Sequence, residues 1–122
     1  MKGSENLKLY DSELKVMEVL WKNGEQTAGS LAKILAEEIG WNRNTTYTVI
    51  KKCIAKGAID RVEPNFLCRS LITKEEVQKF ETKELIDKVF EGSAHQLFAA
   101  LLGGDISNDE ISEIKKMIQE RE

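Results

Sequence analysis

Small polar side chains and lysines share one face of a helix predicted over residues 42–56. With Ile50 at the centre of the inner face, the helical repeat gathers these residues on the outer face: Asn44, Thr45, Thr48, Lys51, Lys52 and Ala55, with Tyr47 at its edge. Amide and hydroxyl groups hydrogen-bond to the edges of DNA bases, and lysines bind phosphates. The outer face has no acidic residue and is rich in threonine, a weak helix former, so it does not suit an ordinary solvated helix. The pattern predicts a helix that reads bases with its first turns and contacts the DNA backbone with its later turns.

Other residues near this helix also suit DNA. Arg43, in the first turn, is placed for a guanine or a phosphate, and Thr27 opens the preceding helix, where a hydroxyl and free amides can bind a phosphate. Arg61 and Arg69 lie in the segment that follows and suit the backbone or the minor groove. Residues 41–73 hold six basic and two acidic residues although the whole chain has a net charge of −3. This local excess favours contact with a polyanion, and the alternative is an ordinary charged surface.

The remaining reactive residues point away from catalysis. The chain has two cysteines, Cys53 and Cys68, and one histidine, His95, which are too few for a disulfide framework, a four-ligand zinc site or most hydrolase triads. Cys53 falls on the inner face of the helix and is expected in the core. The exposure of Cys68 depends on strand register, which leaves a redox role open, and His95 is expected at the surface. No enzymatic activity, metal or cofactor is predicted.

Glycines and capping residues divide the first part of the chain into elements that would position this face. One helix begins with Asp11 or Ser12 as its N-cap and ends at Gly24, and a second runs from Thr27 to Gly40. The third is the helix that carries the polar face. Residues 58–63 alternate as in a strand, a turn follows at residues 64–65, and residues 66–72 form a returning strand. Three helices followed by a β-hairpin are the order of a winged helix.

The second part of the chain is predicted to be helical and too small to bury a stable core by itself. A capping box of Thr73 and Glu76 begins one helix, which ends at Gly92. A short helix follows over residues 93–102, and a capping box of Ser107 and Glu110 begins the last helix. Three short amphipathic helices rarely bury enough surface to be stable alone. They therefore pack on a second copy of the chain or fold back on their own winged helix. We expect a homodimer whose interface contains Val77, Phe80, Ile86, Phe90, Leu97, Phe98, Leu101, Ile111, Ile114 and Ile118.

The predicted fold class is mostly α with a small β wing. A winged helix-turn-helix DNA-binding domain spans residues 1–73, and a three-helix dimerisation region spans residues 74–122. A length of 122 residues with 41% hydrophobic and 32% charged residues fits a globular chain. The apolar runs are too short to cross a membrane, and residues 1–6 have no apolar core of a signal peptide, so a bacterial-type cytoplasmic protein is expected.

Three segments resemble the penicillinase-repressor family of bacterial transcription regulators, the BlaI/MecI type. Residues 12–21 are similar to its first helix, and residues 41–50, with the spacing of Thr45 and Thr48, are similar to its recognition helix. Residues 56–59 resemble the run into its wing, and the likeness extends over about residues 9–120. It implies a winged helix, dimerisation through the C-terminal helices and repression from a palindromic operator. DNA contacts would fall on Arg43, Asn44, Thr45, Tyr47, Thr48 and Lys51.

The chain departs from family patterns in three places. The wing at residues 63–68 lacks the expected tyrosines, and the tail lacks the Cys-x-Cys motifs of the copper-responsive relatives. The resemblance also implies a sensor protease as a partner, which cuts an Asn-Phe bond in antibiotic-responsive members, but the matching pair here is Ala100-Leu101. Two other functions stay open from the residues: a winged-helix module that binds proteins and never reads DNA, and a small-molecule sensor with its pocket between the two domains.

Overall fold

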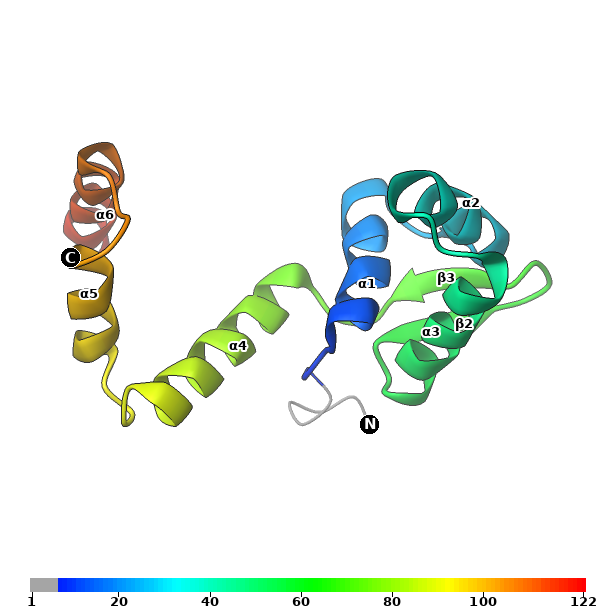
Figure 1. Cartoon of the computed structure of the whole chain (residues 1–122), viewed down its shortest axis with the longest axis horizontal. Helices are drawn as coiled ribbons and strands as arrows, with labels where there is room; N and C mark the ends of the chain where they lie inside the picture. Colours follow the sequence, from blue (N-terminus) through cyan, green and yellow to red (C-terminus); the bar gives the residue numbers. More distant parts are fainter. Residues whose placement is uncertain (1–6) are drawn as a thin grey trace. The chain divides into compact units, whose positions relative to one another are not determined.

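Helices dominate the structure, and a single small sheet accompanies them. The computed structural model describes residues 7–122, so residues 1–6, the segment judged not to be a signal peptide, lie outside the described residues. In chain order the elements are α1 (Asp11–Asn23), β1 (Gln26–Thr27), α2 (Ala28–Ile39), α3 (Arg43–Ala55), β2 (Ile59–Val62), β3 (Leu67–Ser70), α4 (Lys74–Val89), α5 (Ala94–Leu102) and α6 (Asn108–Arg121) (Figure 1). The mostly helical fold with a small β wing is confirmed.

Polar caps fix the starts of the two central helices as predicted. The Ser30 amide donates to Thr27 Oγ1 over 3.1 Å at the start of α2, and the Thr45 amide donates to Asn42 Oδ1 over 2.8 Å at the start of α3. The predicted N-cap of α1 is wrong. This helix is capped one residue earlier, at Tyr10, because the Glu13 carboxylate accepts the Tyr10 amide over 2.8 Å.

The sheet has three antiparallel strands in the order β1-β3-β2. β2 and β3 pair with Val62 opposite Leu67, and together with the turn over residues 63–66 they form the wing. β1 pairs with the other edge of β3, with Thr27 opposite Leu67. The sequence did not predict β1, because two residues are too few to show an alternating pattern. This strand fixes the start of α2 to the wing.

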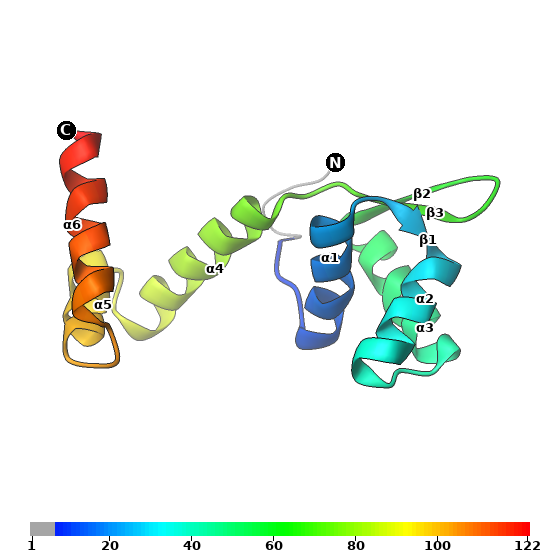
Figure 2. The ribbon, with the colours of Figure 1, turned by 90° about the horizontal axis from the view of Figure 1, so that it is seen from above.

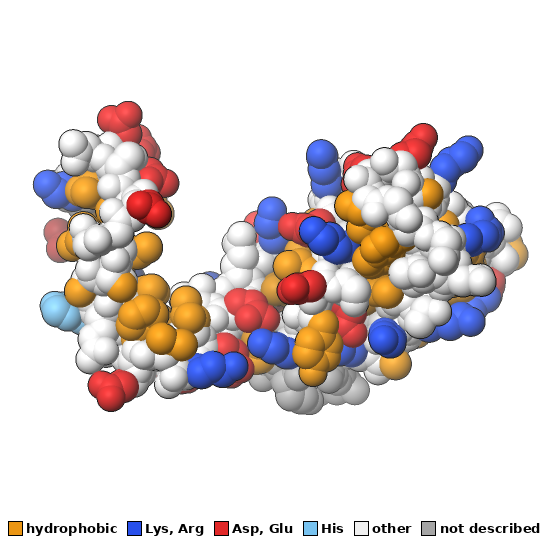
Figure 3. Space-filling model, viewed as in Figure 1, with side chains coloured by type: hydrophobic (Ala, Val, Ile, Leu, Met, Phe, Trp, Pro, Cys, Tyr) orange, Lys and Arg blue, Asp and Glu red, His pale blue; other side chains and the backbone are white. Residues whose placement is uncertain are grey.

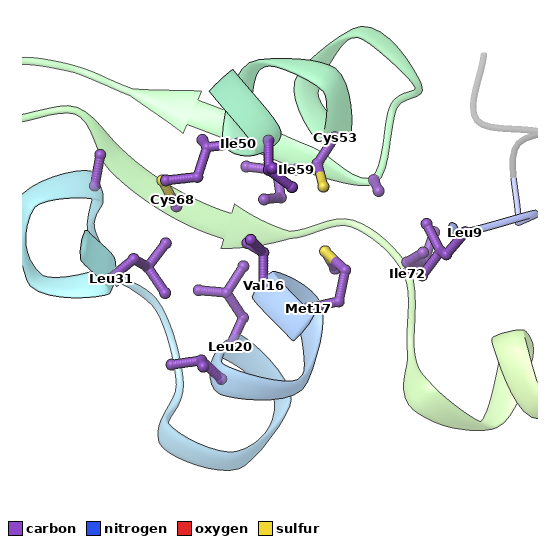
Figure 4. Packing of buried hydrophobic residues seen from close by; sticks show 14 of the residues in the cluster. Leu9, Val16, Met17, Leu20, Leu31, Ile50, Cys53, Ile59, Cys68 and Ile72 are labelled. Atoms are coloured by element: carbon purple, nitrogen blue, oxygen red, sulfur yellow. The ribbon is translucent and has the colours of Figure 1, made fainter. Parts of the chain in front are cut away.

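The core lies between the first three helices and the sheet. Val16 and Leu20 of α1 and Leu31 of α2 point toward Ile50 of α3 and Cys68 of β3 (Figure 4). These side chains are at most 3% exposed. Burial of each large apolar side chain contributes roughly 1.5–3 kcal/mol, so this cluster holds α3 on the rest of the unit.

The chain divides into two compact units after Glu81, eight residues beyond the predicted boundary at Thr73. The first turns of α4 belong to the N-terminal unit because Val77 is only 6% exposed and packs in its core. The Trp21 indole also donates to the Ile72 carbonyl over 3.0 Å, which fixes the approach to α4. The Val77 side chain is therefore already buried within its own chain, although the sequence predicts it in a dimer interface.

The C-terminal unit consists of the end of α4 with α5 and α6 (Figure 2). The predicted capping box of Ser107 and Glu110 is present, and Ser93 Oγ accepts the Gln96 amide at the start of α5, a cap that the sequence did not predict. The Thr73/Glu76 box at the start of α4 is also present. Yet α5 and α6 contain no buried residue. In the described part of the chain, no helix is both long and apolar enough to span a membrane.

Candidate nucleic-acid interface

The two faces of α3 divide as the sequence predicts. Its inner residues are buried: Thr46, Val49, Ile50 and Cys53. Its outer residues are exposed to solvent: Asn44, Thr45, Thr48, Lys51 and Lys52. Tyr47 is half-buried at the edge between the faces. The structure thus brings the amide, the hydroxyls and the lysines onto one solvent-facing surface, which we call the α3 outer face.

The α3 outer face is electrostatically suited to an anion. Its first turn has no acidic residue, and the N-terminus of a helix carries a partial positive charge. Within the described residues, neither Lys51 nor Lys52 forms an ion pair with a carboxylate. Both ammonium groups are therefore available to phosphates. Lys and Arg side chains are visible over α3 and the wing in Figure 3.

Arg43 is held against Tyr47 at the start of α3. Its Nη2 donates to the Tyr47 hydroxyl over 2.9 Å, and its guanidinium carbon lies 4.8 Å from the centre of the Tyr47 ring. Both contacts leave the guanidinium exposed. Arg43 and Tyr47 thus act as a pair rather than as two independent DNA contacts.

A shallow hollow beside Arg43 adds a residue that the sequence reading missed. Gly29, Ser30, Ala32, Lys33 and Ala36 of α2 line it together with Arg43 of α3. Lys33 is exposed and lies one turn after Ser30. Thr27, Ser30 and Lys33 are spaced three residues apart and so share one face of the helix, a pattern from which Lys33 could have been predicted. The hollow carries two cations beside the N-terminus of α2, an arrangement that suits a phosphate.

Thr27 serves first as a structural cap. Its hydroxyl oxygen accepts the Ser30 amide, and the adjacent Ala28 amide donates to the Phe66 carbonyl over 2.9 Å. Two groups that the sequence assigned to phosphate binding thus have partners within the chain. The Thr27 side chain is half-buried and lies at the N-terminus of α2, close to Gly29 and Ser30, which line the hollow.

The wing arginines are already paired with acids. Arg61 forms an ion pair with Glu63, and its guanidinium carbon lies 3.6 Å from the centre of the Phe66 ring. Arg69 Nε donates to Glu25 Oε2 over 2.9 Å, a hydrogen bond that raises the pKa of Arg69 above its ordinary value. Each pair neutralises part of the charge that the arginine would offer to DNA, whereas the Nη donors of both guanidinium groups stay outside these two ion pairs.

Lys56, another member of the basic segment, is structural. Its ammonium group pairs with Glu13, whose carboxylate is 3% exposed, and donates to the Lys8 carbonyl over 2.6 Å. Three of the six basic residues in the segment therefore bind acids of the same chain: Lys56, Arg61 and Arg69. The charge excess of the sequence is concentrated on Arg43, Lys51 and Lys52.

Neither cysteine is suited to chemistry. Cys53 and Cys68 are both fully buried, and burial raises the pKa of Cys53 to about 12 and that of Cys68 to about 11. The expected core position of Cys53 is confirmed, and the register of β3 turns Cys68 inward, which disfavours a redox role. His95 is exposed, and no cluster of potential metal ligands occurs among the described residues.

Apart from Val77, the predicted interface residues remain accessible in the single chain. Phe80, Ile86, Phe90, Leu97, Ile111 and Ile114 are half-buried, and Phe98, Leu101 and Ile118 are 42–52% exposed. Four further apolar residues of the C-terminal unit are exposed: Leu85, Val89, Leu102 and Met117. Figure 3 shows hydrophobic side chains gathered where α4 ends and α5 begins. This accessible apolar surface is unusual for a monomer.

Comparison with known proteins shows the family to which the chain belongs. The penicillinase repressor family matches residues 9–120. The chain is 24% identical to a penicillinase repressor from Bacillus licheniformis over 115 residues, which cover 92% of this chain and 90% of that protein. The structure is similar to the solution structure of the DNA-binding domain of the repressor BlaI, with a TM-score of 0.55 and 27% identity, over 62% of this chain and 93% of that domain. The family is one of regulators, not of enzymes, and the fold is its winged helix. This chain belongs to the penicillinase repressor family.

Proposed function

We propose that this protein is a transcriptional repressor that binds a palindromic DNA operator as a homodimer in the cytoplasm. The observation that carries the proposal is the α3 outer face, which is exposed, free of acids and rich in groups that bond to bases and phosphates. The similarity to a penicillinase repressor and to the DNA-binding domain of BlaI supports it.

The α3 outer face would bind with its N-terminal turns in the major groove. There Asn44, Thr45 and Thr48 meet base edges, because their short polar side chains reach only from a helix that lies close to the bases. Lys51 and Lys52, one or two turns later, meet flanking phosphates. Arg43 and Lys33 bind the phosphate nearest the hollow between α2 and α3.

The C-terminal unit would hold two copies together. Its helices have no buried residue of their own, whereas Phe98, Leu101 and Ile118 are apolar and exposed. A second copy would cover this surface and supply the core that one chain lacks. Two linked winged helices would then bind two half-sites with a gain in effective concentration.

Loss of the dimer would release the operator. A cut between Ala100 and Leu101 would break α5 and separate α6, with Ile111, Ile114 and Ile118, from the rest of the chain. A sensor protease is the partner that the family resemblance implies. Since this bond lies within a helix, cleavage would require local unfolding of α5.

Selection of a random-sequence duplex library on the full-length protein tests the proposal. The expected result is enrichment of an inverted repeat whose half-sites lie about one helical turn apart or a multiple of it. Lys51→Glu should abolish enrichment, whereas Lys15→Glu, an equal change of charge on an exposed position of α1, should not. Absence of any enriched sequence would contradict DNA reading and favour a protein-binding module. Enrichment of single half-sites would contradict the dimer.

A further inference from the structure

Phe66 joins three parts of the N-terminal unit. Its ring meets the Tyr47 ring of α3 edge to face, with 5.7 Å between ring centres and 82° between planes. The Arg61 guanidinium of β2 lies 3.6 Å from the centre of the same ring. Its carbonyl accepts the Ala28 amide at the start of α2 over 2.9 Å. The wing, α2 and α3 therefore meet at this one residue.

The contacts continue from Phe66 to the DNA-facing side of α3. Tyr47 presents its ring and its hydroxyl to Arg43, at 4.8 Å and 2.9 Å respectively. Arg61, Phe66, Tyr47 and Arg43 thus form an unbroken series of ring and cation contacts, which we call the Phe66 stack. One end of the stack is in the wing, and the other is the exposed guanidinium at the first residue of α3.

The backbone of Phe66 indicates that its side chain is needed. Phe66 has a φ of +53°, in the left-handed region that glycine occupies without penalty and that bulky residues rarely adopt. Such an outlier persists only where surrounding contacts favour it. Here those contacts are made by the ring with Tyr47 and Arg61, so a glycine at this position would relieve the backbone and lose the stack.

We propose that Phe66 is a positioning residue that holds Arg43, through Tyr47, in place for a DNA phosphate or guanine. This inference rests on the proposed DNA binding and extends it. An exposed arginine loses considerable rotamer freedom when it binds, and prior ordering of the side chain reduces that loss. The wing thereby strengthens DNA binding without touching DNA. This role fits the contacts of Arg61, whose guanidinium already lies on the Phe66 ring and forms an ion pair with Glu63.

A double-mutant cycle on the full-length protein tests the stack. The probe is the duplex that the wild-type protein selects from a random library, and affinity is measured by fluorescence anisotropy. Phe66→Leu should weaken binding about fivefold, the order expected for one ordered arginine side chain, and Phe66→Tyr, which keeps the ring, should change it less than about twofold. In an Arg43→Ala background, Phe66→Leu should have almost no further effect.

Two more measurements separate positioning from general stability. Tyr47→Phe keeps the ring and removes the hydroxyl acceptor, so it should weaken binding only when Arg43 is present. NMR of the DNA-free protein should show the Arg43 side-chain protons shifted by the Tyr47 ring in the wild type, with the shift lost in Phe66→Leu. The Tyr47 variant also serves as the test if Phe66→Leu does not fold.

The outcomes distinguish this inference from the function on which it rests. Binding losses that persist undiminished in the Arg43→Ala background would overturn the positioning role and leave the proposed function intact. An unshifted Arg43 in the wild-type protein would also overturn it. If the wild-type protein selects no duplex, the proposed function fails, and the positioning role fails with it.

Discussion

Thr46 shows the cost of a polar residue on the inner face of α3. Its side chain is fully buried, and its hydroxyl has no hydrogen-bond partner among the described residues. A buried hydroxyl without a partner destabilises a fold, whereas a methyl group of the same size does not. We expect Thr46→Val to raise the free energy of unfolding of the N-terminal unit by about 1 kcal/mol.

Thr46→Ser is the matched comparison because it keeps the hydroxyl and removes the methyl group. It should lower the free energy of unfolding by about 1 kcal/mol. Urea unfolding followed by the fluorescence of Trp21 and Trp41, both in the N-terminal unit, measures the two variants. A Val variant less stable than the Ser variant would show that the hydroxyl makes a stabilising interaction.

The buried thiols predict a loss of stability in alkali. Burial raises the pKa of Cys53 to about 12 and that of Cys68 to about 11, from an ordinary value of 9.0. The folded state therefore keeps both thiols protonated at pH values where the unfolded chain ionises them. The stability from this difference is complete below pH 9 and is lost as the pH rises from 9 toward 11–12, by about 1.4 kcal/mol per pH unit for each thiol.

Comparison with a Cys53→Val, Cys68→Val variant isolates this effect from the titration of lysines. Between pH 8 and pH 10 the wild-type protein should lose more unfolding free energy than the variant. Equal losses would contradict the raised pKa values. Slow reaction of both cysteines with a thiol reagent at pH 8 should accompany the result, since the thiolate is the reactive form.

At the scale of elements, a buried ion pair fixes the end of α3 to the start of α1. Glu13 is 3% exposed, and Lys56 satisfies its carboxylate while also contacting the Tyr10 ring at 4.6 Å. Removing one partner leaves the other charge buried and unpaired. We expect Lys56→Met to lower the free energy of unfolding by about 3 kcal/mol, measured by the same tryptophan fluorescence.

Lys8→Met is the control because Lys8 forms an ion pair with Glu81 in the same N-terminal unit, and the two side chains are 44% and 41% accessible. Its loss should change stability by less than about 0.5 kcal/mol. Similar effects of the two substitutions would contradict a structural role for Lys56.

The sequence predicts most of the helix boundaries because these are set by local chemistry. Thr27 and Asn42 cap their helices, Gly40 ends α2, and the period of apolar residues assigns Ile50 and Thr48 to opposite faces of α3. β1 is too short to produce a pattern. The start of α1 depends on Glu13, whose position Lys56 fixes from a distant part of the chain.

Charge pairing and side-chain stacking could not be read from the sequence. The carboxylates that neutralise Arg69 and Lys56 are 44 and 43 residues away along the chain. The contact of Phe66 with Tyr47 likewise depends on the path of the wing. Composition therefore identified a basic segment correctly but could not separate its three paired bases from Arg43, Lys51 and Lys52.

At the scale of the whole molecule, the division after Glu81 predicts how truncated chains behave. A fragment of residues 1–81 should match the stability of the N-terminal unit in the full chain. A fragment of residues 1–73 lacks Val77 and should be less stable by about 2 kcal/mol, since it loses the burial of one core side chain.

Light scattering on the same proteins tests the proposed dimer. Both fragments should be monomeric, and the full chain should be dimeric through the exposed apolar side chains of its C-terminal unit. A dimeric fragment of residues 1–81 would move the interface to the N-terminal unit. Equal stability of the two fragments would place the boundary at Thr73, as the sequence predicts.

The most direct test of the account is the base discrimination of variants on the α3 outer face, measured with the selected duplex and with duplexes changed one base pair at a time. Asn44→Ala and Thr48→Ala should each cost about 1–3 kcal/mol on the selected duplex and remove preference at particular base pairs. Lys51→Ala should weaken binding to all duplexes alike and reduce the salt dependence by about one unit of slope. Full discrimination retained by the Asn44 and Thr48 variants would contradict the assignment of α3 as the helix that reads DNA.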